Sequence, residues 1–223
     1  DRAGNSITGP VSDSLLTIDQ VIPELVTLEI TSSNELDPKR SMAGDSISFQ
    51  VNANESINAP IFNINGESYD GSIGLDRSWM FVFPADEVDD GVIDFEMVYT
   101  DLAGNPGVPI TVATDGIPIL KDGTVPELNE ISLFTSNPHD SSLAIKDDTV
   151  FISFRSSEII RDINILLNSN EAKIKSEDSL LYIFYHIFTE SDSEGVIPIS
   201  MDYRDLAGNM GETIDETSDD SEV

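Results

Sequence analysis

Apolar and polar residues alternate along most of this chain with a period of two. Residues 46–52, for example, place Ile47, Phe49 and Val51 on one side and polar residues between them, which is the pattern of a half-buried β-strand. Helical periodicity, with apolar residues three and four positions apart, is nearly absent. Short alternating segments separated by turn residues therefore predict an all-β protein without significant helix, built as antiparallel sandwiches.

Self-similarity along the chain indicates that it is built from repeats. The string Asp-x-Ala-Gly-Asn begins at Asp1, Asp101 and Asp205. Residues 21–25 also match residues 124–128, in a register of 103 residues that the next predicted strand shares. A period of about 100 residues is the size of one seven-stranded immunoglobulin-like sandwich with Greek-key connections. We therefore expect tandem sandwiches of this kind.

Turn residues divide the first repeat into seven predicted strands. Trp79, in the fifth of them, is expected to pack in the core rather than to bind a sugar. The strands are expected near residues 24–31, 46–52, 59–64, 67–73, 78–83, 92–100 and 108–112. Beyond the three residues named above, the predicted core contains Ile93, Phe95, Met97, Tyr99, Val150, Ile152, Phe154, Ile197, Ile199, Met201 and Tyr203.

The repeats also set the expected domain boundaries. Residues 1–18 are interpreted as the final strand of a preceding, truncated repeat, and residues 19–121 and 122–214 as two immunoglobulin-like repeats. Residues 215–223 are so rich in acidic residues that they are expected to form a mobile tail. The linker at residues 113–124 contains two glycines and one proline and is expected to be flexible.

The charge balance restricts the partners of the chain. Its 42 Asp and Glu residues outnumber 11 Lys and Arg residues, which gives a formal net charge of -31. Such a surface repels nucleic acid, and it stays compact most readily when salt screens it or cations neutralise it. The alternative for most of these carboxylates is that they secure solubility only.

Several other kinds of chemistry are not expected. The chain contains no Cys, which excludes disulfides, Cys-based zinc sites and thiol catalysis. No apolar run approaches the roughly 20 residues that span a bilayer, so membrane insertion is not expected. His139 and His186 fall on different predicted elements, and no catalytic triad or phosphate-binding loop is visible. We therefore expect no enzymatic activity in these residues.

Three features together resemble a known family: the Pro-initiated first strand after an Asp-containing linker, a Glu in the loop after the second strand, and the Asp-x-Ala-Gly-Asn turn. They resemble the bacterial immunoglobulin-like tandem repeats of large calcium-binding surface adhesins, and the resemblance covers both repeats. It implies a monomeric spacer, extracellular on the bacterial cell surface or secreted, whose partners are neighbouring repeats of the same chain. The adhesion ligand would then bind a distal domain outside this segment, and Ca²⁺ would stiffen the domain junctions.

The topology of a seven-stranded sandwich independently predicts where such ions bind. The incoming linker, the loop after the second strand and the loop before the last strand lie at one tip of the domain. Three carboxylates there, with loop carbonyls and water, supply the six to eight oxygens that Ca²⁺ takes. The predicted ligands are Asp19, Glu55 and Asp101 in the first repeat and Asp122, Glu158 and Asp205 in the second.

Alternatives remain for these carboxylates and for the function. Asp101 and Asp205 could instead cap the turns that they begin, and in those turns Gly and Asn need no ion. Acidic residues at 86–90 and 190–194 are expected to be solvated loop charges at the opposite tip, with Asp89 or Asp90 as an alternative junction ligand. The alternative functions are a glycan- or protein-binding immunoglobulin-like module and accessory domains of a secreted enzyme.

Overall fold

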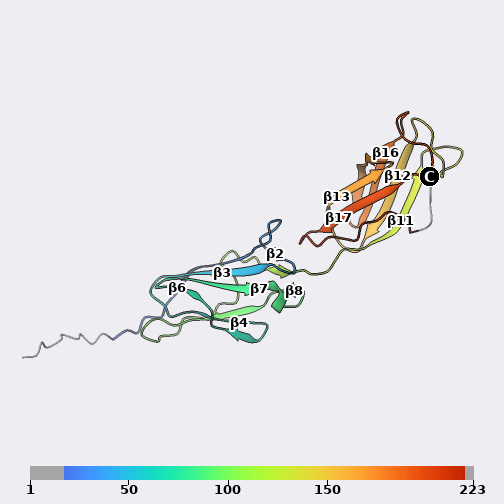
Figure 1. The fold of residues 1–223 in the computed structure, drawn as a ribbon. Coiled ribbons are helices and arrows are strands. Elements are labelled where there is room, and N and C mark those ends of the chain that lie inside the picture. The colour runs from blue at the N-terminus through green and yellow to red at the C-terminus, as the bar shows by residue number, and fades with distance from the viewer. Residues whose placement is uncertain (1–17, 219–223) are drawn as a thin grey trace, which may run out of the picture.

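The computed structural model describes residues 18–218, which form two β-sandwich domains joined end to end (Figure 1). The predicted strand of a preceding repeat, residues 1–18, lies almost entirely outside the described residues. No described segment forms a helix of the length and apolar character that crossing a bilayer requires. Within residues 18–218 the one helical element is a single turn, η1 (Ala85–Glu87).

The first domain consists of two main antiparallel sheets. One has the strand order β1-β3-β7-β6, and the other has the order β5-β4-β9, extended by a bridge between Met97 and Ile110. This is the A-B-E-D and C-F-G arrangement of immunoglobulin domains, with a hairpin strand added beside strand C. The strands are β1 (Leu25–Ser32), β3 (Ser46–Ala53), β4 (Ile61–Ile64), β5 (Glu67–Tyr69), β6 (Ile73–Leu75), β7 (Ser78–Pro84) and β9 (Phe95–Val98).

The second domain repeats this topology. Its sheets have the orders β11-β12-β16-β15 and β14-β13-β17, and a bridge between Met201 and Ile214 adds the last strand position. The prediction of tandem, all-β, immunoglobulin-like sandwiches is confirmed. The strands are β11 (Leu128–Thr135), β12 (Thr149–Ser156), β13 (Ile160–Leu167), β14 (Asn170–Glu171), β15 (Lys173–Asp178), β16 (Leu181–Ile187) and β17 (Ile199–Asp205).

Each domain has its own apolar core between the two sheets. In the first domain Phe49 is fully buried and lies 4.8 Å from Phe62 and 5.4 Å from Phe95, measured between ring centroids. All predicted core residues are buried except Phe95, which is half-buried against the same cluster. Trp79 is also partly buried against this core, as predicted.

The fourth predicted strand, near residues 67–73, is wrong as a single element. The chain forms β5 on strand β4 and then β6 on strand β7, so it crosses from one sheet to the other between Tyr69 and Ile73. Ser72, at the crossing, donates a hydrogen bond to the Pro60 carbonyl at 2.8 Å. The predicted strand near 108–112 contributes only the bridge at Ile110.

The prediction of a flexible linker at residues 113–124 is wrong for most of that segment. Ile119 is buried in the first domain, and β10 (Leu120–Lys121) lies between two short strands. It pairs in parallel with β2 (Arg40–Ser41) and antiparallel with β8 (Gly91–Val92). Backbone pairing and burial therefore hold the linker to the first domain up to Lys121.

The predicted mobile tail at residues 215–223 begins too early. Ser218 donates its backbone N–H to the Ile131 carbonyl, and its hydroxyl accepts the Ile131 N–H at 2.7 Å. Thr114 makes the same pair of bonds with Leu28 in the first domain. Strand β11 thus binds the chain as far as Ser218, and residues 219–223 lie outside the described residues.

Candidate metal centres

The Asp205 carboxylate organises the Asp-x-Ala-Gly-Asn turn of the second domain. It is fully buried and accepts backbone N–H bonds from Gly208 at 2.6 Å and Asn209 at 2.9 Å. The Asn209 side-chain amide donates a third bond, at 2.8 Å. Gly208 has a φ of 104°, which side chains disfavour and Gly tolerates. The turn-capping role considered for Asp205 is therefore real, whether or not the carboxylate also binds an ion.

The first domain builds the same turn on Asp101. Its carboxylate accepts the Asn105 N–H at 2.8 Å and the Asn105 side-chain amide at 2.7 Å. Burial raises the pKa of Asp101, but the hydrogen bonds from Asn105, Gly104 and Ala103 outweigh it, so the pKa lies below its usual range. Asp101 therefore stays ionised through the physiological range.

The structure brings all six predicted ligands together in two groups of three. Asp122, Glu158 and Asp205 each place one carboxylate oxygen within 4.8 Å of those of the other two. Asp19, Glu55 and Asp101 do the same at the outer tip of the first domain. In each group the turn Asp is buried and the Glu is half-buried. Both triads could therefore direct oxygen ligands at one cation.

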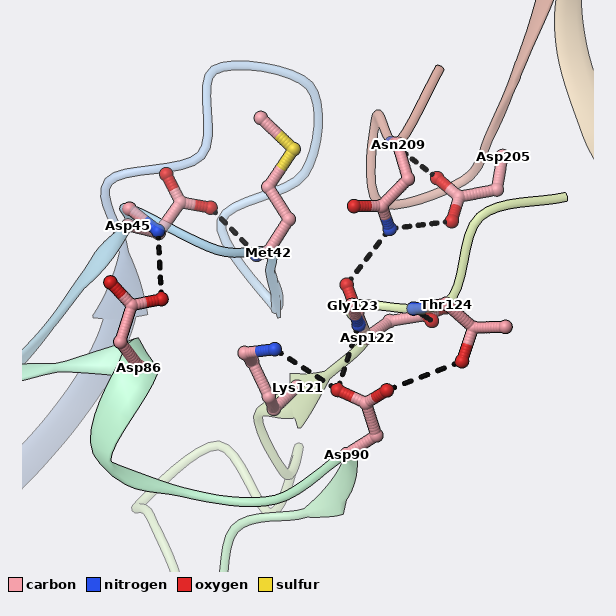
Figure 2. A network of polar contacts seen from close by, with 11 residues as sticks. Met42, Asp45, Asp86, Asp90, Lys121, Asp122, Gly123, Thr124, Asp205 and Asn209 are labelled. Atoms are coloured by element: carbon pink, nitrogen blue, oxygen red, sulfur yellow. Dashed lines mark hydrogen bonds and ion pairs between the residues drawn. The ribbon is translucent and has the colours of Figure 1, made fainter. Parts of the chain in front are cut away.

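The Asn of each turn positions the linker carboxylate, a role that the sequence analysis did not assign. Asn209 donates from its side chain to the Asp122 carbonyl at 2.9 Å while it also binds Asp205 (Figure 2). Asn105 donates to the Asp19 carbonyl at 3.3 Å in the first domain. The Asn amide therefore ties the incoming linker to the turn, so that the linker Asp faces the buried Asp.

Repulsion and burial oppose ionisation of Asp122 and Glu158, two members of the triad at the junction between the domains. Burial raises the pKa of Asp122, and the charges of Asp205 and Asp90 raise it further. Burial also raises the pKa of Glu158, with added repulsion from Asp122 and Asp205. Arg40 offsets both shifts only in part. Clustered carboxylates of this kind need a proton or a cation to balance their charge.

This repulsion predicts a pH dependence in calcium-free buffer. When folding raises the pKa of an acid, the folded state loses stability as the pH rises. The loss occurs between the ordinary pKa of the acid and its pKa in the folded state. For Glu158 that window begins at the ordinary value of 4.5. We expect Glu158→Gln to unfold at higher denaturant than the unmodified chain at neutral pH, and the difference to shrink as the pH falls toward that value. Equal midpoints at neutral pH would contradict mutual repulsion in the triad.

Asp90 is an exposed loop charge, as expected, but it also has a structural role at the junction. Its carboxylate accepts bonds from Lys121 Nζ at 3.0 Å, the Gly123 N–H at 2.8 Å and the Thr124 hydroxyl at 3.2 Å (Figure 2). The Lys121 side chain is only 7% exposed, so it requires a nearby counter-charge. Lys121 in turn holds the pKa of Asp90 below its usual range. Asp90 therefore secures the linker and is not a member of either triad.

A loop of the first domain also covers the turn of the second domain. Asn34 donates its side-chain amide to the Ala207 carbonyl at 2.6 Å, and both residues are buried. A side chain at Gly208 would come within 3.0 Å of Leu36 and 3.5 Å of Met42. This contact between the domains carried no signal in the sequence, because it joins residues 173 positions apart.

The strand order and the repeated tip define this chain as a tandem immunoglobulin-like protein. No known family and no curated protein matches its sequence. Among solved structures, it is similar to an E-to-A variant of a titin fragment of three immunoglobulin domains, with a TM-score of 0.49 and 9% sequence identity. The match covers 89% of this chain and 66% of the titin fragment.

Proposed function

We propose that this chain is a non-catalytic spacer in the stalk of a bacterial cell-surface adhesin, in which Ca²⁺ at the domain tips makes the junctions rigid. The observation that carries the proposal is the triad of Asp122, Glu158 and Asp205, which lies at the junction between the two domains. An equivalent triad, Asp19, Glu55 and Asp101, lies at the outer tip of the first domain. Each domain therefore has the same candidate cation site.

The donor set favours Ca²⁺ over other ions. Both triads consist of carboxylates alone, and hard oxygen ligands suit Ca²⁺, Mg²⁺ or Mn²⁺ rather than zinc or copper. Mg²⁺ requires a small octahedral shell and keeps several waters, whereas Ca²⁺ accepts six to eight oxygens in flexible geometry. A linker, a loop and a turn contribute the three carboxylates, and such a mixed site fits the more tolerant ion.

A cation at the junction would close the remaining hinge. On the side of the first domain, Asp90 already holds Gly123 and Thr124. On the side of the second domain, an ion shared by Asp122, Glu158 and Asp205 would tie the linker to two loops at once. Residues 122–124 would then be anchored from both sides, and the angle between the domains would be restricted.

The cell-surface location is supported by general properties of the chain. Calcium sites in extracellular modules bind with dissociation constants of about 10⁻⁴–10⁻³ M, which suits ligands gathered from loops. The high negative charge and the absence of Cys agree with a bacterial surface repeat that cations rather than disulfides stabilise.

Calorimetric titration of the whole chain with Ca²⁺ tests the proposal directly. We expect two sites of about 10⁻⁴–10⁻³ M affinity. Glu158→Gln should lose the junction site and keep the outer one, and Glu55→Gln should do the reverse. A chain that releases no heat with Ca²⁺, or single variants that both keep two sites, would contradict the assignment. Titration with Mg²⁺ should give weaker binding at both sites.

A further inference from the structure

The outer face of one sheet in the second domain carries three aromatic side chains in a row across neighbouring strands. Phe134 on β11 pairs with Phe151 on β12, and Phe151 pairs with Tyr185 on β16. The rings of Phe134 and Phe151 stack, with their centroids 5.1 Å apart. Phe134 is 36% exposed and the other two are half-buried, whereas the residue before each of them belongs to the core. We call these three residues the aromatic row.

The sandwich fold does not require the aromatic row. The two domains share one strand order, yet the repeat register of 103 residues gives the first domain small or aliphatic residues at these positions. They are Thr31, Ser48 and Val82, which pair across the equivalent strands. Apolar side chains that gather on an exposed surface mark interaction sites. The aromatic row is therefore a candidate binding surface that belongs to the second domain alone.

Two lysines without an ion-pair partner border the aromatic row. Lys173 pairs with Tyr185 across the sheet, and Lys175 Nζ lies 4.0 Å from the centroid of the Phe151 ring. In the part of the chain that the structure describes, every other Lys and Arg except Arg77 forms an ion pair. The ring face attracts the Lys175 ammonium and holds it against the sheet. This surface therefore presents positive charge in a chain whose net charge is -31.

Two open hollows meet at Tyr185 and supply polar groups beside the rings. The first has a volume of about 450 Å³ and is lined by Thr149, Phe151, Ile174, Lys175 and Tyr185. Within residues 18–218, the hydroxyls of Thr149 and Tyr185 form no hydrogen bond. The second hollow has a volume of about 290 Å³, and its lining is Asn170, Glu171, Lys173, Tyr185, His186 and Ile187.

We propose that this face of the second domain binds an acidic polysaccharide, a chain of sugars that carry carboxylates. The C–H groups of a sugar ring pack on aromatic and aliphatic side chains, and its hydroxyls match the free hydroxyls of Thr149 and Tyr185. A sugar carboxylate accepts a charge-assisted hydrogen bond from Lys175. Because Glu171 lines the second hollow, the carboxylate binds in the first hollow, beside Lys175.

The shape of the face favours a polysaccharide over an acidic peptide. The paired positions from Phe134 to Lys173 cross three strand spacings, about 14 Å, which suits an extended ligand. A peptide that binds a sheet commonly adds a strand at its edge, and β15 is that edge. A register shift between Ile174 and Ser176 interrupts β15, and bulges and lysines both protect an edge from pairing.

The test titrates acidic hexasaccharides into the 223-residue chain and follows the amide signals by NMR. The probes are oligomers of galacturonate, mannuronate and hyaluronan, all in chelator so that calcium cannot bridge sugar and protein. We expect saturable shifts at Phe151, Lys175 and Tyr185 and none at Ser48 and Val82. A neutral glucose hexasaccharide should bind at least about tenfold more weakly, because it lacks the charge-assisted bond.

Three variants locate the site. Lys175→Glu and Phe151→Ser should each weaken binding by about tenfold or more, and the second introduces the residue that the first domain has at this position. Arg77→Glu is the matched control, because it makes the same charge change at the other cation without an ion pair, and it should leave binding unchanged. Thermal midpoints close to that of the unmodified chain show that the variants fold.

Three results would overturn the proposal. The first is the absence of saturable shifts with all three acidic sugars. The second is equal weakening by Arg77→Glu, which would indicate general attraction of charge. The third is a polyglutamate peptide that binds the same residues as tightly, because the ligand would then be an acidic protein. Since calcium is absent throughout, these outcomes are independent of whether the metal centres exist.

Discussion

Removal of calcium from the full chain is expected to lower the unfolding temperature of both domains and to loosen the angle between them. An ion that binds only the folded state with a dissociation constant of about 10⁻⁴ M stabilises that state by about 1.4 kcal/mol at about 1 mM, which is about ten times the dissociation constant. For domains of this size, each kcal/mol shifts the midpoint by about 4–8 °C. Chelation of millimolar calcium should therefore lower the midpoint by about 6–11 °C, and small-angle X-ray scattering should show a more bent particle.

Two matched substitutions separate stability from stiffness. Glu55→Gln and Glu158→Gln each remove one carboxylate from an equivalent triad, but only Glu158 lies at the junction between the two domains. In millimolar calcium both should lower the midpoint of their own domain. Only Glu158→Gln should change the scattering profile toward that of the chelated chain. If both variants scattered like the unmodified chain, the calcium hinge would be wrong, although calcium could still stabilise each domain.

Substitution of Asp205 should separate its two roles, in the turn and in the metal centre. Asp205→Ala leaves the half-buried N–H groups of Gly208 and Asn209 without their acceptor. We expect it to destabilise the second domain by roughly 3 kcal/mol even in chelator. Asp205→Asn keeps one acceptor oxygen for the two backbone N–H groups, loses the bond from the Asn209 side-chain amide, and removes a charge that repels Asp122 and Glu158. In chelator it should lie within about 1 kcal/mol of the unmodified chain.

In calcium, the second domain of Asp205→Asn should no longer be as stable as that of the unmodified chain. With millimolar calcium, the unmodified second domain gains stability, while neither Asp205 variant should gain it. Denaturant unfolding in both buffers measures these differences, with calorimetry to count the remaining sites. If Asp205→Asn kept both calcium sites, the carboxylate would serve the turn alone and the metal assignment for this residue would be wrong.

The strands and the two triads were predictable for different reasons. Alternation of apolar and polar residues around Phe49 and Phe154 identified the buried faces, because successive side chains of a strand point to opposite faces of the sheet. The triads followed from topology, since a linker, a B–C loop and an F–G loop share one tip in any sandwich of this order. The prediction therefore placed Asp122, Glu158 and Asp205 together without knowledge of their side-chain positions.

The errors arose where pairing partners are remote and segments are short. β10 and β2 have two residues each, too few for alternation to be visible, and Gly116 and Pro118 suggested a flexible linker instead. The split between β5 and β6 arises because β5 pairs with the edge of one sheet, at β4, and β6 pairs with the edge of the other, at β7. The ties of Asp90 to the linker and of Asn34 to Ala207 likewise have no local sequence signature.

By itself, then, the sequence determined the repeat, the all-β class, the core faces and the six carboxylates at the tips, because these are carried by periodicity and by an order of strands common to both repeats. Only the tertiary structure decided that the linker is a strand of the first domain and that Asp90 and Asn34 hold the junction. These features depend on hydrogen bonds and contacts between distant segments, which form only once both sheets of a domain are in place.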